Sequence, residues 1–277
     1  MMRRVLMLLL ALALTGCAGT AEAPEAPLPP QEAAPLQSEA APQQESVSLQ
    51  QETAPPRQEA VPPQPETTVQ MSPEQIPQQP PELLELMEQA GAELGQIEGG
   101  QLIAVSSEGA AAQLWGYELL ENGQWQLTLG PASGHVGKNG VAADKREGDK
   151  KTPAGLFPLT RAFGIRPDPG STLPYRQVTA DSYWVDDPAS RFYNPWVEGT
   201  EERDWSSAEH LADYDAQYAY AVVVDYNVEP VVPGGGSAIF LHCGTRPTAG
   251  CISVPEEDLL AFLKWLEPDR QPVIVIV

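Results

Sequence analysis

The chain contains only three histidines and three cysteines, so few side chains are available as a nucleophile and its base. His242 follows the apolar run Ala238 to Leu241, and Cys251 comes nine residues later, just before a predicted helix. A nearby imidazole can accept a thiol proton, and the positive field at a helix N-terminus favours the thiolate. The spacing therefore predicts a Cys–His nucleophile. A cysteine that packs as a small hydrophobe beside a hydrogen-bonding histidine fits the same positions.

Cys243, which adjoins His242, leaves three interpretations open. In an oxidising compartment it could form a disulfide with Cys251 and block the nucleophile. The three side chains could also bind zinc, although neighbouring residues of a strand point to opposite faces and no fourth ligand is close in sequence. The same alternation favours packing of Cys243 in the core. We predict that His135 and His210 are structural or surface residues.

Two segments around this pair carry a resemblance. Gly236 to His242 reads GSAIFLH, and Pro247 to Ile252 reads PTAGCI. Together they resemble the catalytic segment of the YkuD-like L,D-transpeptidases, in the branch with a shortened His-to-Cys interval. The similarity spans roughly Gln101 to Val277. Further segments agree in the same order: Gly137–Gly140, Lys145–Asp149 with Thr152–Gly155, Tyr193–Asn194, Ser207–Glu209 and Asp225–Asn227.

The resemblance implies a mainly β domain with a few helices, a YkuD-like β-sandwich that acts on peptidoglycan stem peptides. Cys251 would be the nucleophile and His242 the general base. The thiolate would attack the carbonyl before the terminal D-Ala of a tetrapeptide stem and form a thioester. An amine acceptor would then give a cross-link, whereas water would give carboxypeptidase action. No metal or cofactor is implied, and a hydrolase of the same fold (an L,D-carboxypeptidase or amidase) or a non-catalytic wall-binding module remain alternatives.

The Cys motif departs from the longer signature of the family, Ser/Thr-His-Gly-Cys. Thr248 matches the hydroxyl position and Gly250 the glycine, but Ala249 replaces the second histidine. Ser253 stands where an arginine often follows the cysteine, so stem contacts made there are not carried over. We expect Thr248 and Gly250 to support the motif, and backbone N–H groups around Gly250 and Cys251 are the nearest candidates for an oxyanion hole.

Tyr193 and Asn194, with Arg191, form a polar-aromatic cluster that the family places near its site. The resemblance makes Tyr193 and Asn194 candidate substrate-binding residues. The alternative is turn chemistry for the Asn-Pro pair and a core position for the tyrosine.

Short strands separated by Gly or Asn-Gly must position these residues. A helix is predicted over Glu82 to Leu94. A second is predicted after Ser253, because Ser253 to Glu256 fits a capping box, an apolar face follows, and Pro268 ends the pattern. Strands are predicted over Gln101–Val105, Ala112–Leu120, Gln124–Leu129, Tyr218–Tyr226, Ala238–Leu241 and Pro272–Val277.

The first residues have the pattern of an export signal. Two arginines precede ten apolar residues, Val5 to Leu14, which are too few to span a bilayer. Leu14 to Cys17 (LTGC) resembles the lipobox of bacterial lipoproteins, so residues 1–16 are predicted to be a signal peptide and Cys17 the lipidated residue. The alternative is an ordinary signal peptide with an incidental cysteine.

Residues 17–81 are predicted to be a disordered tether, and residues 82–277 the catalytic domain. All 19 aromatic residues lie at Trp115 or later, and 15 of the 29 prolines lie between Pro24 and Pro81. Such a segment cannot bury enough apolar surface to fold. The net charge of −22 argues against nucleic acid as a partner, because phosphate contacts need clustered Lys and Arg. We therefore expect an exported, membrane-anchored protein of the cell envelope.

Overall fold

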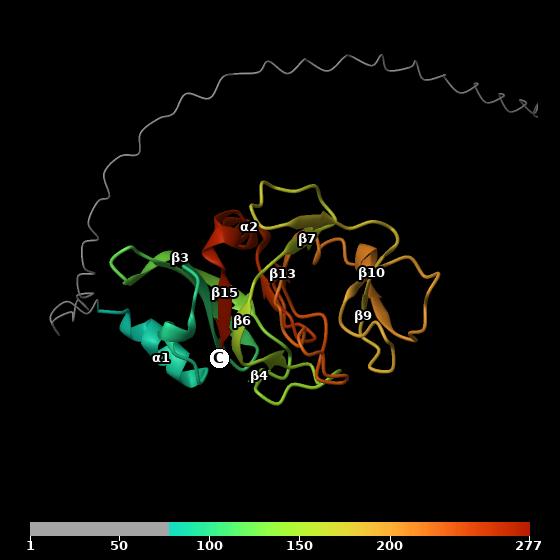
Figure 1. The fold of residues 1–277 in the computed structure, drawn as a ribbon, viewed down its shortest axis with the longest axis horizontal. Coiled ribbons are helices and arrows are strands. Elements are labelled where there is room, and N and C mark those ends of the chain that lie inside the picture. Colours follow the sequence, from blue (N-terminus) through green and yellow to red (C-terminus); the bar gives the residue numbers. More distant parts are fainter. Residues whose placement is uncertain (1–77) are drawn as a thin grey trace, which may run out of the picture. The chain divides into compact units, whose positions relative to one another are not determined.

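A computed structural model describes residues 78–277 (Figure 1). The predicted signal peptide, Cys17 and most of the predicted tether lie outside the described residues. The prediction of a mainly β fold with a few helices is confirmed. The helices are α1 (Pro81–Gln89), η2 (Leu94–Gln96), η3 (Leu211–Asp213), α2 (Glu256–Trp265) and η4 (Pro268–Arg270). The strands are β1 (Gln101–Glu108), β2 (Ala111–Leu119), β3 (Trp125–His135), β4 (Val141–Ala142), β5 (Thr152–Pro153), β6 (Gly155–Pro158), β7 (Ala162–Gly164), β8 (Tyr175–Gln177), β9 (Ser182–Val185), β10 (Trp196–Glu198), β11 (Ala208–His210), β12 (Ala221–Val223), β13 (Phe240–Cys243), β14 (Ile252–Val254) and β15 (Val273–Ile276).

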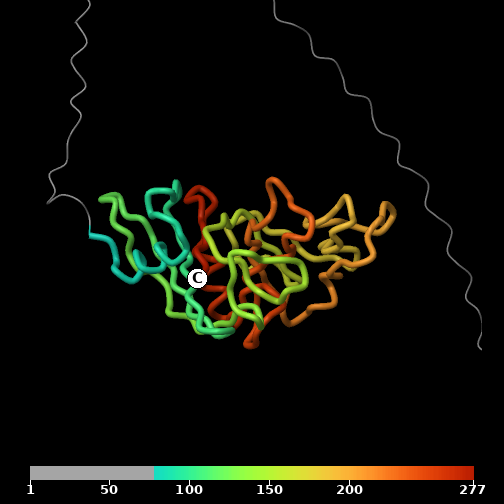
Figure 2. Tube along the Cα trace, turned by 90° about the horizontal axis from the view of Figure 1, so that it is seen from below, coloured from blue at the N-terminus to red at the C-terminus, as the bar shows by residue number. Residues whose placement is uncertain are grey.

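Ten strands form one curled mixed sheet, in the order β6-β15-β1-β2-β3-β14-β13-β12-β7-β8. The first strand, β1, pairs in parallel with the last, β15, so the C-terminal strand lies beside the strand that follows the N-terminal helices (Figure 2). Near the middle, β13 pairs in parallel with β14 and antiparallel with β12. These three strands carry or adjoin the residues of the candidate site.

Strand alternation separates the hydrophobic clusters on the two faces of the sheet. In β1, Leu102 and Ala104 pack in a cluster with α1, whereas Ile103 and Val105 belong to the cluster that contains the apolar side chains of α2. All four are fully buried. A strand covered on both faces needs a continuous apolar run, and that is what β1 provides.

A three-stranded sheet, β10-β9-β11, packs against the large sheet through aromatic rings. Phe163 of β7 lies edge-on to Trp196 of β10 at 5.5 Å and to Phe240 of β13 at 5.0 Å between ring centroids. Trp184 of β9 lies edge-on to the same Phe240 at 4.8 Å. These contacts fix the small sheet beside β13 and therefore place β11 next to the candidate site.

Both predicted helices differ from the observed ones at one end. The predicted helix over 82–94 ends at Gln89, because Gly91 adopts a left-handed conformation (φ +66°) that closes the helix. The capping-box prediction at Ser253 was wrong. Ser253 lies in β14, its hydroxyl donates to the carbonyl of Arg246 at 2.9 Å, and the N-cap of α2 is Pro255, which has no side-chain cap. Within residues 78–277 no helix is long and apolar enough to cross a membrane.

Candidate active site

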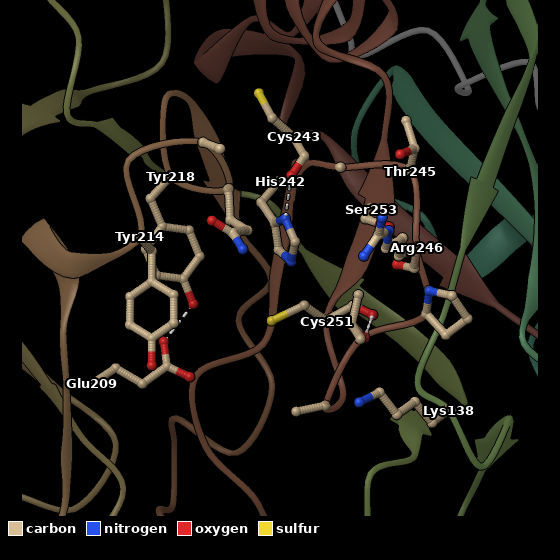
Figure 3. Close-up of a pocket in the computed structure, with 16 residues that line it drawn as sticks. Lys138, Glu209, Tyr214, Tyr218, His242, Cys243, Thr245, Arg246, Cys251 and Ser253 are labelled. Carbon is tan, nitrogen blue, oxygen red and sulfur yellow. Dashed lines mark hydrogen bonds between the residues drawn. The ribbon is translucent and has the colours of Figure 1, made fainter.

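One pocket of about 650 Å³ contains the predicted nucleophile and base, Cys251 and His242 (Figure 3). His242 lies on β13, and Cys251 immediately precedes β14, which runs parallel to β13. The parallel register pairs His242 with Ser253, so Cys251, two residues before Ser253, lies level with Phe240 and on the same face of the sheet as His242. Cys251 and His242 are each only 7% exposed. The structure thus brings together the two residues that the sequence spacing singled out.

The imidazole of His242 is oriented by a hydrogen bond to the backbone. Nδ1 lies 2.8 Å from the carbonyl oxygen of Cys243, and a carbonyl only accepts, so Nδ1 carries the proton. Nε2 is then the unprotonated nitrogen, and Figure 3 shows the ring beside the Cys251 sulfur. Burial lowers the pKa of His242, which keeps the ring neutral near pH 7. A neutral imidazole with a free Nε2 is the form that a general base requires.

The thiol of Cys251 is buried and protonated at rest. Sγ donates to the carbonyl of Ala238 at 3.1 Å. Burial raises the pKa of this thiol strongly, and the nearby carboxyl of Glu209 raises it further. The expected activation by a helix N-terminus is wrong, because β14 separates Cys251 from α2. His242 lines the same pocket as this thiol.

Thr248 and Gly250 hold the loop before Cys251. The hydroxyl of Thr248 donates to the carbonyl of Cys251 at 2.6 Å and accepts from the N–H of Gly250 at 3.1 Å. Thr152 of β5 donates to the carbonyl of Gly250 at 2.7 Å. The Gly250 amide is thus engaged by the loop itself, which leaves the Cys251 amide as the remaining oxyanion-hole candidate.

Cys243 lies in a different environment from Cys251. Its thiol donates to the carbonyl of Tyr220 at 3.6 Å, and its side chain belongs to the main core cluster, on the face opposite His242. Both cysteines are free thiols. Burial raises the pKa of Cys243 to about 11, so this thiol is protonated near neutral pH. The packing interpretation agrees with this placement.

The structure also shows where the potential metal ligands and the two remaining histidines lie. Within the described part of the chain, no group of three or more His, Cys, Asp or Glu side chains is arranged to hold a metal ion. His210 stacks on Tyr183 at 4.7 Å and pairs with Asp213 at 3.0 Å, and His135 ends β3 opposite Ser253. Both have the structural roles expected of them.

The arrangement of strands and the Cys–His pocket agree with a match to a known protein family. A family model for the L,D-transpeptidase catalytic domain, YkuD, matches residues 111–275. The chain belongs to this family. A comparison with curated proteins found no significant match. The substrate of the YkuD family is peptidoglycan, so the domain acts outside the cytoplasm.

Tyr193 and Asn194 do not line the Cys251 pocket of this YkuD domain. Asn194 is buried, and its Oδ1 accepts hydrogen bonds from Trp184 Nε1 and from the Ala238 N–H, each at 3.0 Å. Tyr193 accepts from the Gly236 N–H at 2.9 Å. We therefore interpret Tyr193 and Asn194 as positioning residues. They hold the backbone segment whose Ala238 carbonyl accepts the thiol of Cys251.

Three pocket residues of the YkuD domain were missed as functional candidates in the sequence. Glu209 on β11 accepts a short hydrogen bond from the hydroxyl of Tyr218, and the ring of Tyr218 lies edge-on to His242 at 5.6 Å. Tyr214 lies beside Tyr218, with ring centroids 5.0 Å apart. The segment Ser207–Glu209 was among those that resemble the family, but the sequence assigned it no function. Only the packing of the small sheet against β13 brings Glu209 to the pocket.

Proposed function

We propose that the protein is a peptidoglycan L,D-transpeptidase in which Cys251 and His242 carry out acyl transfer. The observation that carries this proposal is the orientation of His242 in the Cys251 pocket. Its Nδ1 proton is held by the Cys243 carbonyl, so Nε2 is free to accept the thiol proton. Membership of the YkuD family supplies the substrate class.

In the first half-reaction, Cys251 transfers its proton to Nε2 of His242 and attacks the carbonyl carbon before the terminal D-Ala of a tetrapeptide stem. Because the pKa of the resting thiol is raised, we expect proton transfer and attack to occur together. The tetrahedral intermediate then expels D-Ala, whose nitrogen receives the proton from His242. A C–S bond has formed and a C–N bond has broken, which leaves a thioester on Cys251.

In the second half-reaction, the amine of another stem attacks the thioester. Nε2 of His242 accepts a proton from the attacking nitrogen and returns it to the departing sulfur. The product is a cross-link between two stems. Water in place of the amine would give the carboxypeptidase product by the same steps.

We also propose that Cys17 is lipidated and anchors the protein to a membrane through the Pro-rich segment. Support comes from the LTGC sequence after a ten-residue apolar run. Two acyl signals give stable attachment, whereas an unlipidated chain would have none. Cys17→Ala should release the protein from the membrane fraction, and retention without acyl mass on the native protein would contradict the anchor.

Incubation of the full chain with a tetrapeptide donor and an amine-bearing acceptor stem, followed by mass spectrometry, tests the proposed reaction. We expect release of D-Ala and a cross-linked product. Cys251→Ala should give neither, and Cys243→Ala is the matched control that should give both. Hydrolysed donor without cross-link would assign a carboxypeptidase. No product and no acylation of Cys251 with any stem would assign a binding module.

A further inference from the structure

The Cys251 pocket has two walls of opposite chemical character (Figure 3). Glu209, Tyr214 and Tyr218 form one wall, which we call the acidic-aromatic wall. Lys138 and Arg246 lie on the other side. Cys251 and His242 stand between them in this view. The proposed reaction uses a donor and an acceptor, and the two walls of this pocket offer them different partners.

The carboxylate of Glu209 has no cationic partner in the described residues. Tyr218 donates to Oε2, whereas Oε1 accepts no hydrogen bond from residues 78–277 and is not sealed from the pocket. No Lys, Arg or His within the same range forms an ion pair with Glu209. A carboxylate held away from bulk water without a counter-ion is unfavourable, so a bound cation would be stabilised there.

The surroundings of Glu209 favour a ligand that carries both charge and a proton. Burial raises the pKa of Glu209, the hydrogen bond from Tyr218 opposes this shift, and the nearby acids Asp186 and Glu147 add to it, so that the pKa is about 7. Near neutral pH the group can therefore both bind a cation and accept its proton. The titratable groups that face it from the packed elements are Tyr214, Tyr218, Cys251, Asp186 and Glu147.

We propose that Glu209, with the rings of Tyr214 and Tyr218, is the site that binds the ammonium group of the acceptor and removes its first proton. This inference rests on the proposed transpeptidase function. Tyrosine faces add cation–π attraction to the carboxylate. Lys138 and Arg246 on the other side would repel an ammonium group and suit the terminal carboxylate of the donor.

The acceptor arrives as R–NH₃⁺ and gives one proton to the Glu209 carboxylate, which becomes a carboxylic acid. The neutral amine attacks the thioester carbon and forms the new C–N bond. His242 accepts the second proton and returns it to Cys251 as the C–S bond breaks. Glu209 then releases its proton to water, which resets the site.

The donor stem also carries a side-chain amine, so the test must distinguish the two sources of an ammonium group. In the full chain, Glu209→Gln keeps the acceptor for the Tyr218 hydroxyl but removes the charge. Glu202→Gln is the matched control, since Glu202 is an exposed carboxylate that pairs with Arg191 far from the pocket lining. Two acceptors are compared with one donor: Nα-acetyl-lysinamide, which is cationic, and hydroxylamine, which is neutral near pH 7.

We expect Glu209→Gln to lower the ratio of aminolysis by Nα-acetyl-lysinamide to hydrolysis by about tenfold or more. Aminolysis by hydroxylamine should fall by less than about threefold. The burst of D-Ala release should not fall, because the variant removes a charge that raises the pKa of Cys251. The rise of lysinamide aminolysis with pH, centred on the raised pKa of Glu209, should disappear. Glu209→Asp should recover part of the selectivity, and Glu202→Gln should behave as the wild type.

Four results would overturn the proposal. An equal loss with both acceptors would give Glu209 a purely structural role. A loss confined to the D-Ala burst or to the KM of the donor would place the donor's ammonium group at this site. Unchanged acceptor selectivity in a folded Glu209→Gln protein that still forms the acyl-enzyme would refute the inference alone. Absence of any acyl-enzyme in the wild type would refute the proposed function with it.

Discussion

His242 is prepared for base catalysis by two neighbouring features of the backbone and core. The Cys243 carbonyl fixes its tautomer, and burial lowers its pKa so that the ring is neutral. The same burial raises the pKa of Cys251, so neither partner is charged at rest. A neutral pair in a pocket avoids the cost of burying an ion pair and forms charge only during the reaction.

His242→Ala should lower the rate of Cys251 acylation by about 10²–10⁴-fold, because it removes the proton acceptor. The pH profile of the wild type should show an acid limb below about 6.5, since His242 is the base only when neutral and its pKa is lowered. Stopped-flow or quenched acylation rates across pH measure both effects. An acid limb centred above 7 would contradict the assignment, as would a fully active variant.

Glu209→Gln should alter the pH dependence of stability. The carboxyl has a pKa of about 7 in the fold and near the ordinary value when unfolded, so the folded state holds the proton more tightly. The free energy of unfolding therefore falls as the pH rises from about 4.5 to 7. Glu209→Gln lacks this titration. Its free energy of unfolding, relative to that of the wild type, should therefore increase by on the order of 1–3 kcal/mol between pH 5 and pH 8. Urea unfolding at the two pH values measures the difference, and an equal offset at both would refute it.

At the scale of elements, two parts of the fold form the pocket. The β12-β13-β14 ladder carries His242 and Cys251, and the small sheet carries Glu209. Side chains of β13 point alternately to its two faces. Leu241 and Cys243 pack in the main core, whereas Phe240 and His242 lie on the opposite face, toward the small sheet. The segment before β13 is fixed by Asn194, which binds the Ala238 N–H. Ala238 has a left-handed backbone (φ +53°), unusual for a residue with a Cβ, so it must be held by its surroundings.

Asn194→Ala should therefore weaken both the fold and the site. It leaves Trp184 Nε1 and the Ala238 N–H without their acceptor, which should cost about 2–4 kcal/mol of unfolding free energy. Release of Ala238 should also slow acylation, because its carbonyl holds the Cys251 thiol. Denaturant unfolding and acylation rates measure the two losses. A variant with unchanged stability would show that Asn194 does not hold this segment.

Alternating and apolar runs made most large-sheet strands predictable, because β1, β13 and β15 each contain an unbroken run of at least three buried residues. The Cys251–His242 pair was predictable from the resemblance of its motifs to the family, because spacing alone fitted a packed cysteine beside a hydrogen-bonding histidine equally. The position of Glu209 was not predictable, since it depends on the aromatic packing of the small sheet against β7 and β13. The predicted N-cap at Ser253 was wrong because its hydroxyl donates a hydrogen bond to the carbonyl of Arg246 and does not cap α2. Tyr193 and Asn194 have contacts that only the folded chain brings together.

At the scale of the whole molecule, α1 belongs to the catalytic domain because Leu83, Leu86 and Met87 are buried in the cluster with β1 and β2. The domain should therefore begin near residue 78 and fold without the preceding Pro-rich sequence. Limited proteolysis of the full chain should leave a resistant fragment that begins between residues 78 and 82. A protected fragment that includes residues 30–70 would contradict this division.

The central claim, that Cys251 is the nucleophile, is tested most directly by trapping the thioester. The full chain is mixed with tetrapeptide donor alone, quenched in acid, and analysed by intact-mass and peptide-mapping mass spectrometry. The account predicts one adduct with the mass of the donor minus D-Ala, on Cys251, in the wild type and in Cys243→Ala, and none in Cys251→Ala. Release of D-Ala by the Cys251→Ala protein, or an adduct on Cys243, would contradict it.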